Sequence, residues 1–397
     1  MSSLAQGIAA KAAQDTAACI GCRECLAVCP VAPADLRIAD LNLAVAGGAP
    51  PGPEAVTTFA TECLQCGRCV PVCPAGLERD VMTLWQRANL PHLAPGAEDH
   101  LRHLGGGQPV ARRVEVVLHN LRHRARLKGL ARYVDKRVLR SADTLFFFGC
   151  NIFSDTGLPA KVLALADYLD IRYEVLGGLS NCCGWSHHLA GDTDRAERLM
   201  DHLHERIGQV RPKEVVTIGA ECYAALKRLV AVKDAGFTPV TATSWVRRNL
   251  HRFPIRRASG NLTFHDACHV SRKLGEGEEA RRVLRQFGGF VEMRDHGEDA
   301  TCCGFHQYNA NPEQLKALRE ARVAMAGEAG ADTLVTECVR CQESFAAAGE
   351  AAGVRVVDVI DLVFEAVMDD DNLSPQPVHF KSPIRNVSRG AAPAEGT

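Results

Sequence analysis

The sequence predicts an α/β protein in which a mostly helical N-terminal region precedes two similar α/β copies. Three observations lead to this prediction. Two four-cysteine runs of identical spacing precede residue 80, and a second cysteine pattern recurs at an interval of about 118 residues in the rest of the chain. Each copy of this second pattern also alternates short strand-like segments with helical ones, which implies a parallel sheet covered by helices.

The composition is that of an ordinary globular protein. Its 397 residues suffice for two or three domains. Hydrophobic residues make up 46% and charged residues 23%, which excludes a mostly disordered or fibrous chain. Lys and Arg number 46 against 47 Asp and Glu, and this net charge of −1 argues against a nucleic-acid partner. The unusual number is 17 cysteines.

The cysteines indicate metal or redox chemistry in a reducing compartment. The Ala-rich start, residues 1–18, resembles neither a signal peptide nor a transit peptide. No run of 18 apolar residues is present to form a transmembrane helix. In a reducing compartment, spaced cysteines bind metals or carry redox chemistry more often than they form disulfides. We therefore expect a cytoplasmic protein, with peripheral attachment to the inner face of the membrane through a partner as an open alternative.

The two N-terminal runs read C-x2-C-x2-C-x3-C-P, the spacing of bacterial two-cluster ferredoxins. In such a pair, three cysteines of each run hold one cubane and the fourth reaches the other cubane. A pair of zinc sites fits less well, because zinc sites usually combine two C-x2-C pairs across a longer loop. We therefore expect two [4Fe–4S] cubane clusters in residues 1–90. The predicted ligands are Cys19, Cys22, Cys25 and Cys73 for one cluster, and Cys63, Cys66, Cys69 and Cys29 for the other.

Residues 91–140 form a basic connector with one or two expected amphipathic helices. Its Arg and His residues accompany apolar residues at helical spacing, from Val114 to Leu121. The basic face could dock on a partner subunit or an anionic membrane surface. A solvated face that joins two domains is the favoured interpretation, because almost no aromatic residues accompany the charges. Residues 368–397 are polar, contain several Pro and Ser residues, and are predicted to be a disordered tail.

The remainder contains two copies of one pattern, which we call copy one (141–255) and copy two (256–367). Corresponding cysteines are offset by 118, 120 and 116 residues, and they fall just after strand-like segments. Ligands of open α/β sheets bind beyond the carboxyl ends of the strands, so the cysteines of each copy should converge on one crevice. They are Cys150, Cys182, Cys183 and Cys222 in copy one, and Cys268, Cys302, Cys303, Cys338 and Cys341 in copy two.

This doubled Cys…Cys-Cys-Gly…Cys-x-x-Cys pattern behind a two-cluster ferredoxin resembles the CCG-domain iron–sulfur oxidoreductases. The resemblance covers about residues 15–365. That family includes the heterodisulfide reductase D-type subunit and the iron–sulfur subunits of glycolate oxidase and anaerobic glycerol-3-phosphate dehydrogenase. The stretch from His265 to His269 is also similar to the HDPCH stretch common there. The resemblance implies two Rossmann-like CCG domains.

In that family a complete motif binds a non-cubane [4Fe–4S] cluster that cleaves and reduces a disulfide. Copy two has all five cysteines, so the resemblance implies a catalytic cluster there. Adjacent Cys302 and Cys303 can hold neighbouring metal atoms, whereas five inert core cysteines are the less favoured alternative.

Copy one departs from the pattern, because Ala225 replaces its fifth cysteine. Its four thiolates could hold zinc or a further cluster, or serve the structure without metal. His187, His188 and His306 follow the two Cys-Cys-Gly motifs. For these histidines a surface or supporting role is favoured over ligation or proton donation.

One helix of copy two has readable end signals. Asn311 is the expected N-cap, Pro312 the first helical residue, and Gln314 the partner that completes a capping box. Leu315, Leu318, Arg322 and Met325 follow at helical spacing and form a mostly apolar face.

Two functions fit this reading. The first is an enzyme, an iron–sulfur oxidoreductase subunit of heterodisulfide-reductase type within a multi-subunit complex. It would relay electrons through the cubanes to or from a copy-two cluster that reduces or forms a disulfide. The alternative is a non-catalytic electron-transfer subunit of a flavoprotein 2-hydroxy-acid or glycerol-3-phosphate dehydrogenase.

No Gly-x-Gly-x-x-Gly follows a predicted strand, so a flavoprotein or quinone-linked partner is expected to perform any hydride chemistry. A protein that only binds, without redox chemistry, is the third class. An iron-free native protein would indicate it.

Overall fold

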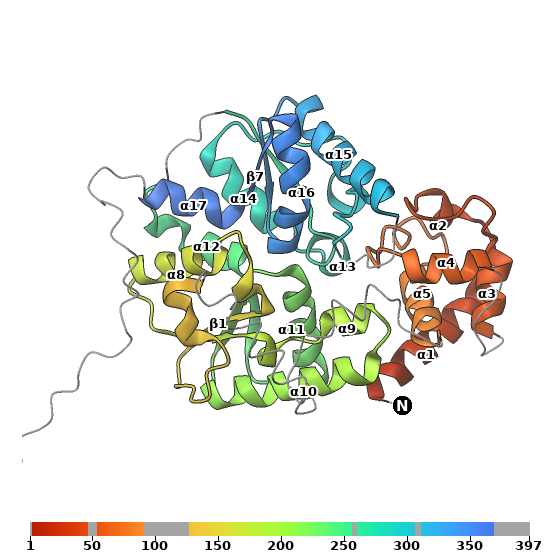
Figure 1. Ribbon diagram of the computed structural model, residues 1–397, viewed down its shortest axis with the longest axis horizontal. Helices are drawn as coiled ribbons and strands as arrows, with labels where there is room; N and C mark the ends of the chain where they lie inside the picture. Colours follow the sequence, from red (N-terminus) through yellow and green to blue (C-terminus); the bar gives the residue numbers. More distant parts are fainter. Residues whose placement is uncertain (1, 47–53, 91–126, 256–259, 306–310, 369–397) are drawn as a thin grey trace, which may run out of the picture.

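The computed structural model describes residues 2–46, 54–90, 127–255, 260–305 and 311–368. The predicted connector up to residue 126, His306 and the tail from residue 369 lie outside these ranges. Figure 1 shows a helical N-terminal region beside two α/β units that lie one above the other. The predicted fold class, a helical ferredoxin-like region followed by two α/β copies, is confirmed.

The N-terminal region is built from short helices around the two cysteine runs. Between the runs the described residues contain two helices, α3 and α4. Helix α1 buries Leu4, Ile8 and Ala12, and it packs on α5 and on α10 of copy one. The bounds are α1 Ser3–Ala18, α2 Glu24–Ala27, α3 Ile38–Ala46, α4 Glu54–Glu62 and α5 Arg79–Ala88.

Copy one contains a four-stranded parallel sheet in the order β2-β1-β3-β4. Its central strand β1 is buried along its whole length, as expected for a parallel strand covered on both faces. Phe146 and Phe148 face one core and Phe147 faces the other, because side chains alternate along a strand. The strands are β1 Thr144–Gly149, β2 Tyr173–Gly177, β3 Glu214–Thr217 and β4 Thr238–Thr241. The helices are η1 Lys128–Tyr133, η2 Cys150–Phe153, α8 Leu158–Tyr168, η3 Leu179–Asn181, α9 Trp185–Leu189, α10 Thr193–Val210, α11 Ala220–Lys233, α12 Ala242–Asn249 and η4 Leu250–Arg252.

Copy two repeats this topology with a shorter sheet, β5-β6-β7, which is also parallel. The counterpart of β2 is reduced to a single parallel bridge between Leu262 and Phe290. The strands are β5 Leu262–His265, β6 Thr333–Thr336 and β7 Arg355–Asp358. The helices are α13 Ser271–Leu274, α14 Glu278–Phe287, η5 Gly297–Asp299, α15 Pro312–Glu328, α16 Val339–Ala352 and α17 Val359–Met368.

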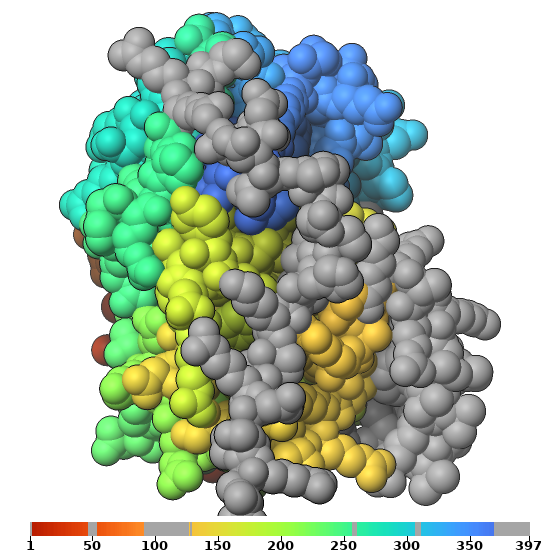
Figure 2. Space-filling model, turned by 90° about the vertical axis from the view of Figure 1, so that its left-hand side faces the viewer, coloured from red at the N-terminus to blue at the C-terminus, as the bar shows by residue number. Residues whose placement is uncertain are grey.

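The two copies share one hydrophobic core. Helices α8 and α12 of copy one pack against α14 and α17 of copy two. The core between the sheets combines Phe146 and Trp245 of copy one with Phe264 and Val335 of copy two. On the face opposite the N-terminal region, Figure 2 shows the blue C-terminal helices of copy two directly above the yellow-green segments of copy one. Separating the copies would therefore expose the core that both require.

The start of α15 differs in one respect from the sequence expectation. The Asn311 side chain caps the helix by accepting the Glu313 amide at 2.9 Å, and Pro312 opens the first turn, as expected. Gln314 does not complete a capping box. Its side-chain nitrogen instead donates to the carbonyl of Pro30 at 3.0 Å, which ties copy two to the end of the first cysteine run.

Candidate functional site

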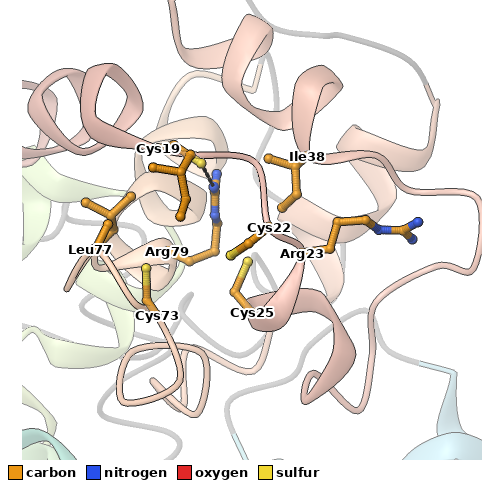
Figure 3. A pocket seen from close by; sticks show the side chains of 10 residues that line it. Cys19, Cys22, Arg23, Cys25, Ile38, Cys73, Leu77 and Arg79 are labelled. Atoms are coloured by element: carbon orange, nitrogen blue, oxygen red, sulfur yellow. Dashed lines mark hydrogen bonds between the residues drawn. The ribbon is translucent and has the colours of Figure 1, made fainter.

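The first cysteine set of the N-terminal region lies at the surface, and we call it the outer site. Cys19, Cys22, Cys25 and Cys73 line a hollow of about 350 Å³ that is partly open to solvent (Figure 3). Cys22 is exposed, and Ile20 beside it is 69% exposed. The guanidinium of Arg79 donates to Cys19 Sγ at 3.3 Å. Four thiols around an apolar hollow, with a cation against them, fit a thiolate-bound [4Fe–4S] cluster.

The second set lies deeper, and we call it the inner site. Cys29, Cys63, Cys66 and Cys69 line a neighbouring hollow of about 370 Å³. Burial raises the pKa of Cys63 to about 11 and that of Cys29 to about 12, because the loss of hydration disfavours the thiolate more than the nearby backbone N–H groups favour it. Each site thus combines three cysteines of one run with the fourth of the other, and the donor set suits a cubane.

The two runs follow the same backbone path. In each, the residues on either side of the second cysteine have positive φ, with Gly21 and Arg23 in the first run and Gln65 and Gly67 in the second. Gln65 has both its backbone and side-chain nitrogens within hydrogen-bonding distance of Cys63 Sγ, at 3.4 and 3.5 Å. The second run therefore keeps the geometry of the first without a glycine at that position.

The five cysteines of copy two are brought together at the carboxyl ends of β5 and β6. Cys341 Sγ lies 3.4 Å from Cys303 Sγ, and the thiols form hydrogen-bonding contacts from Cys268 through Cys302 to Cys303 and from Cys341 to Cys338. The thiol of Cys302 lowers the pKa of Cys268 well below its usual range, despite burial. A thiolate is the form that binds metal. Five converging thiols in a buried crevice fit a cluster with several metal atoms.

The four cysteines of copy one also converge. Their thiols form one chain of contacts, in the order Cys150, Cys182, Cys183, Cys222. Ala225, which stands where copy two has Cys341, is buried in the core beside them. Among the described residues, no group of three or more His, Cys, Asp and Glu side chains is arranged to hold a single metal ion. This holds for copy two as well, and in both copies the thiols contact one another in a row.

The backbone of each Cys-Cys-Gly motif requires a glycine at the third position. Gly184 and Gly304 have φ values of +77° and +70°, a region that side chains disfavour. A Cβ on Gly184 would lie 2.7 Å from the carbonyl oxygen of Ala196, and one on Gly304 would lie 2.8 Å from a methyl of Leu315. In both motifs the glycine N–H donates to the Sγ of the first cysteine at 3.4 Å. The turn therefore fixes one thiol of each set.

A charged side chain of each copy lies close to a cysteine of the other copy. Arg340 of copy two reaches Cys150 Sγ at 3.8 Å and pairs with Glu343 at 2.8 Å. Glu221 of copy one lies 3.8 Å from Cys338 Sγ of copy two. Glu337 is buried without a hydrogen-bond partner for either carboxylate oxygen, and this burial raises its pKa well above the usual range. Burial beside the copy-two cysteines therefore favours the neutral acid.

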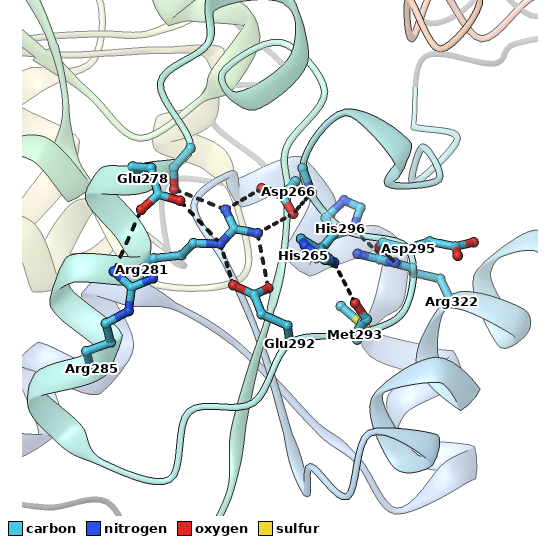
Figure 4. Close-up of polar contacts among 12 residues, drawn as sticks. His265, Asp266, Glu278, Arg281, Arg285, Glu292, Met293, Asp295, His296 and Arg322 are labelled. Atoms are coloured by element: carbon cyan, nitrogen blue, oxygen red, sulfur yellow. Dashed lines mark hydrogen bonds and ion pairs between the residues drawn. The ribbon is translucent and has the colours of Figure 1, made fainter. Parts of the chain in front are cut away.

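The stretch from His265 to His269 has mainly supporting contacts (Figure 4). Asp266 binds the Arg281 guanidinium through both oxygens, at 2.7 and 2.9 Å, and accepts the Gly297 amide at 2.7 Å. His265 accepts from Nε of the fully buried Arg322 at 3.1 Å. Burial lowers the pKa of His265 to about 3, so its imidazole is neutral and can accept.

The two histidines after the first Cys-Cys-Gly motif are both buried, and neither has a surface position. His187 Nδ1 lies 3.0 Å from Asp192, and the His188 ring lies 4.6 Å from that of Trp185, tilted by 43°. Trp185 also contacts His269 of copy two, next to Cys268. Trp185 thereby links His188 to the seam between the copies.

The inner site touches copy two directly. The thiol of Cys66 is in hydrogen-bonding contact with that of Cys302, which lowers the pKa of Cys66 to about 7. Val31, Leu64 and Leu315 pack around this contact. Sequence reasoning did not identify the cations at this seam, Arg272 and Lys273, or Arg87 of α5. Their partners are far away in the sequence, so no spacing could have indicated them.

Comparison with known proteins agrees with this organisation. Residues 144–227 and 262–346 match the cysteine-rich domain family CCG, and residues 18–77 match a 4Fe-4S dicluster domain family. The D-type subunit of dihydromethanophenazine:CoB–CoM heterodisulfide reductase from Methanosarcina barkeri is 26% identical over 390 residues, which cover 88% of this chain and 93% of the relative.

Two further relatives match shorter parts. The B-type subunit of fumarate reductase (CoM/CoB) from Methanothermobacter marburgensis is 26% identical over 57% of this chain and 46% of its own length. EtfAB:quinone oxidoreductase from Syntrophomonas wolfei is 23% identical over 56% of this chain and 34% of its own length. Two cysteine-rich CCG domains behind a 4Fe-4S dicluster domain thus support assignment of the chain to the CCG-domain iron–sulfur oxidoreductases.

Proposed function

We propose that the chain is a heterodisulfide-reductase-type subunit in which copy two is the catalytic centre. Cys268, Cys302, Cys303, Cys338 and Cys341 would hold a non-cubane [4Fe–4S] cluster, and the outer and inner sites would hold one cubane each. Iron–sulfur clusters supply single electrons, which disulfide chemistry requires in pairs. The observation that carries the proposal is the contact between Cys66 of the inner site and Cys302 of copy two.

The exposure of the three cysteine sites indicates where a redox partner would bind. The outer site includes the exposed Cys22, the inner site includes the buried Cys63 and Cys66, and Cys66 contacts the copy-two thiol of Cys302. A redox partner, a flavoprotein or a quinone-linked subunit, would therefore exchange electrons at the outer site. The names of two relatives include a small electron carrier, dihydromethanophenazine in one and a quinone in the other. A partner subunit that exchanges electrons with such a carrier would fit the outer site.

The proposed reaction is the two-electron reduction of a disulfide, or its reverse. The S–S bond breaks, two electrons arrive from the partner's reduced flavin or quinol, and two protons complete two thiols. The chain contributes the thiol crevice of copy two and neighbouring buried groups that exclude water. Copy one lacks the fifth cysteine, and we assign its four cysteines, Cys150, Cys182, Cys183 and Cys222, a structural role.

The first experiment is metal analysis combined with a disulfide assay on anaerobically purified protein. Three clusters require about 12 iron atoms per chain, four per cluster. Reduced-dye-dependent cleavage of low-molecular-weight disulfides, including the CoM–CoB heterodisulfide, should accompany them. Cys302→Ser should lose this activity and about four iron atoms, whereas Cys182→Ser in copy one should keep both.

A second function is favoured by the exposed outer site and by the match to EtfAB:quinone oxidoreductase. In it the chain only transfers electrons for a flavoprotein dehydrogenase. Full iron content without cleavage of any disulfide, together with co-purification of a flavin-containing 2-hydroxy-acid or glycerol-3-phosphate dehydrogenase, would select this function. About 8 iron atoms per chain would leave copy two without a cluster and overturn the first proposal.

A further inference from the structure

The seam between the inner site and copy two contains two adjacent cations from α13. Arg272 donates to the Cys66 carbonyl at 2.8 Å, to the Glu298 carbonyl at 2.7 Å, and to the Ala300 carbonyl. All three are neutral acceptors, so Arg272 clamps the backbone, and its charge also helps to lower the pKa of Cys66. Its neighbour Lys273 has a different environment.

Lys273 places its ammonium group between the two cysteine sets. Its Nζ lies 2.8 Å from an oxygen of Asp80, and the side chains are only 25% and 6% exposed. Its aliphatic stem passes the backbone of the second cysteine run, because a Cβ on Gly67 would lie 3.3 Å from Lys273 Cε. Burial alone would lower the pKa of Lys273, but Asp80 and the thiols of Cys268 and Cys66 raise it. The group therefore stays charged.

Asp80 faces the opposite side of this ion pair. It lines the hollow of the inner site, and its charge acts on the thiols of Cys63 and Cys69. The pair is thus a fixed dipole, with its positive end at the junction of Cys66 and Cys268 and its negative end toward the remaining inner cysteines. A fixed charge in such a poorly solvated place acts far more strongly than one at the surface.

We propose that Lys273 sets the reduction potentials of the inner and copy-two clusters, with Asp80 opposing it at the inner cluster alone. This inference rests on the proposed function, because it assigns clusters to both sites. A cation stabilises the more negative, reduced form of a neighbouring redox centre. Lys273 therefore makes reduction of both clusters easier. Because Asp80 opposes it at the inner cluster alone, the pair favours transfer of an electron from the inner cluster to the copy-two cluster.

The test is a redox titration of the intact, cluster-loaded protein, monitored by EPR. We expect Lys273→Met to lower the equilibrium constant for one-electron reduction of the inner and copy-two clusters by about tenfold, a shift of about 59 mV to more negative potential. The outer cluster should keep its potential and serves as the internal reference. Lys273→Arg should behave as wild type. Lys213→Met, which removes a lysine 80% exposed on copy one, is the matched control.

Asp80→Asn separates an electrostatic role from a structural one. It breaks the same ion pair but leaves the cation, so the inner cluster should shift to more positive potential. A structural tie would instead make both variants shift in the same direction. Such a result, or unchanged potentials in Lys273→Met, would overturn the inference.

If the Lys273→Met protein fails to assemble its clusters, Asp80→Asn tests the inference alone. A shift of the inner-cluster potential to more positive values supports the electrostatic role, and a shift to more negative values overturns it. If copy two proves to hold no iron, the proposed function fails. In that case the inner cluster still decides the role of Lys273.

Discussion

Gly304 closes the Cys-Cys-Gly turn of copy two, where the fold leaves no room for a side chain. A Cβ would meet Leu315 at 2.8 Å, and φ is +70°. We expect Gly304→Ala to lower the free energy of unfolding by about 1–3 kcal/mol, the usual cost of such backbone strain. It should also lower the iron content, because the Gly304 amide that fixes Cys302 Sγ would be displaced. Urea unfolding and iron analysis measure the two effects.

Gly327 provides the control for this substitution. It lies within α15 without positive φ, and an added Cβ would have nothing within 4 Å, so Gly327→Ala should stabilise the helix by up to about 1 kcal/mol. The same loss of iron in both variants would contradict the role assigned to the Gly304 turn. Gly184→Ala should destabilise copy one in the same way, because its Cβ would meet a carbonyl oxygen at 2.7 Å.

His188 makes the stability of the protein depend on pH. Burial, together with the charges of Arg228 and Lys273, lowers its pKa to about 3. In the unfolded chain a histidine titrates near pH 6.5, so protonation favours unfolding. Its contribution is complete above about pH 6.5 and is lost progressively as the pH falls toward 3. We expect His188→Phe, which stays neutral, to reduce the loss of stability between pH 7 and pH 5.

Denaturant unfolding of the variants at pH 7, 6 and 5 measures this slope. The exposed His251, changed to Phe, is the matched control and should leave the slope unchanged. His265 has a similarly lowered pKa, so part of the acid sensitivity should remain in His188→Phe. An identical slope in wild type and His188→Phe would refute the assignment.

At the level of single residues, the sequence predicted the thiols better than the charges that support them. Cysteines at fixed spacing are rare, so their pattern is informative even without a structure. Arginine and lysine are common, and the contacts of Arg340 and Lys273 join different copies or different domains. Arg322 even occupied a helix face that was predicted as mostly apolar. It is fully buried because His265 and a backbone carbonyl accept its N–H groups.

Among the elements, helix α5 holds the N-terminal region together through Arg87. Its guanidinium donates to the carbonyls of Ala60 at 2.7 Å, Thr61 at 3.3 Å and Cys63 at 2.6 Å, and also to Leu189 of α9. We expect Arg87→Met to lower the free energy of unfolding by about 2–3 kcal/mol, since several buried carbonyls lose a charged donor. Hydrogen exchange at residues 60–66 should speed up as the second cysteine run loosens.

Arg282→Met on α14 is the matched control for Arg87→Met. Arg282 is 58% exposed and pairs only with Glu279 on the surface of α14 in the contacts described, so its loss should change stability by less than about 0.5 kcal/mol. Equal stability of the Arg87 and Arg282 variants would show that the carbonyl clamp contributes little.

The elements themselves follow from local patterns, and their exceptions have tertiary causes. Strand β1 contains a run of large apolar residues and is buried along its whole length, and α15 was predicted from Asn311 and Pro312. The side chain of Gln314 was assigned to a capping box, but a carbonyl from a distant run competes for it. The counterpart of β2 in copy two shrinks to one bridge at Phe290, a reduction that the repeat spacing does not reveal.

At the scale of the whole molecule, the sequence predicted the parts but not their arrangement. Spacing within each run or copy sets which cysteines meet, because those contacts are local to one fold unit. The docking of the N-terminal region depends on long-range contacts of Arg272, Lys273, Gln314 and Arg87. It is this docking that puts Cys66 against Cys302.

The arrangement of the three sites predicts which clusters interact magnetically. Thiols of the inner site and copy two touch, whereas the outer site faces solvent at Cys22. In any redox state in which two clusters are paramagnetic, EPR signals of the inner and copy-two clusters should therefore broaden each other. Brief treatment with an oxidant should destroy the outer cluster first, because its thiols are the most exposed, and leave that mutual broadening intact. Loss of the copy-two cluster first, or broadening only between the outer and inner signals, would show that electrons do not reach copy two through the inner site.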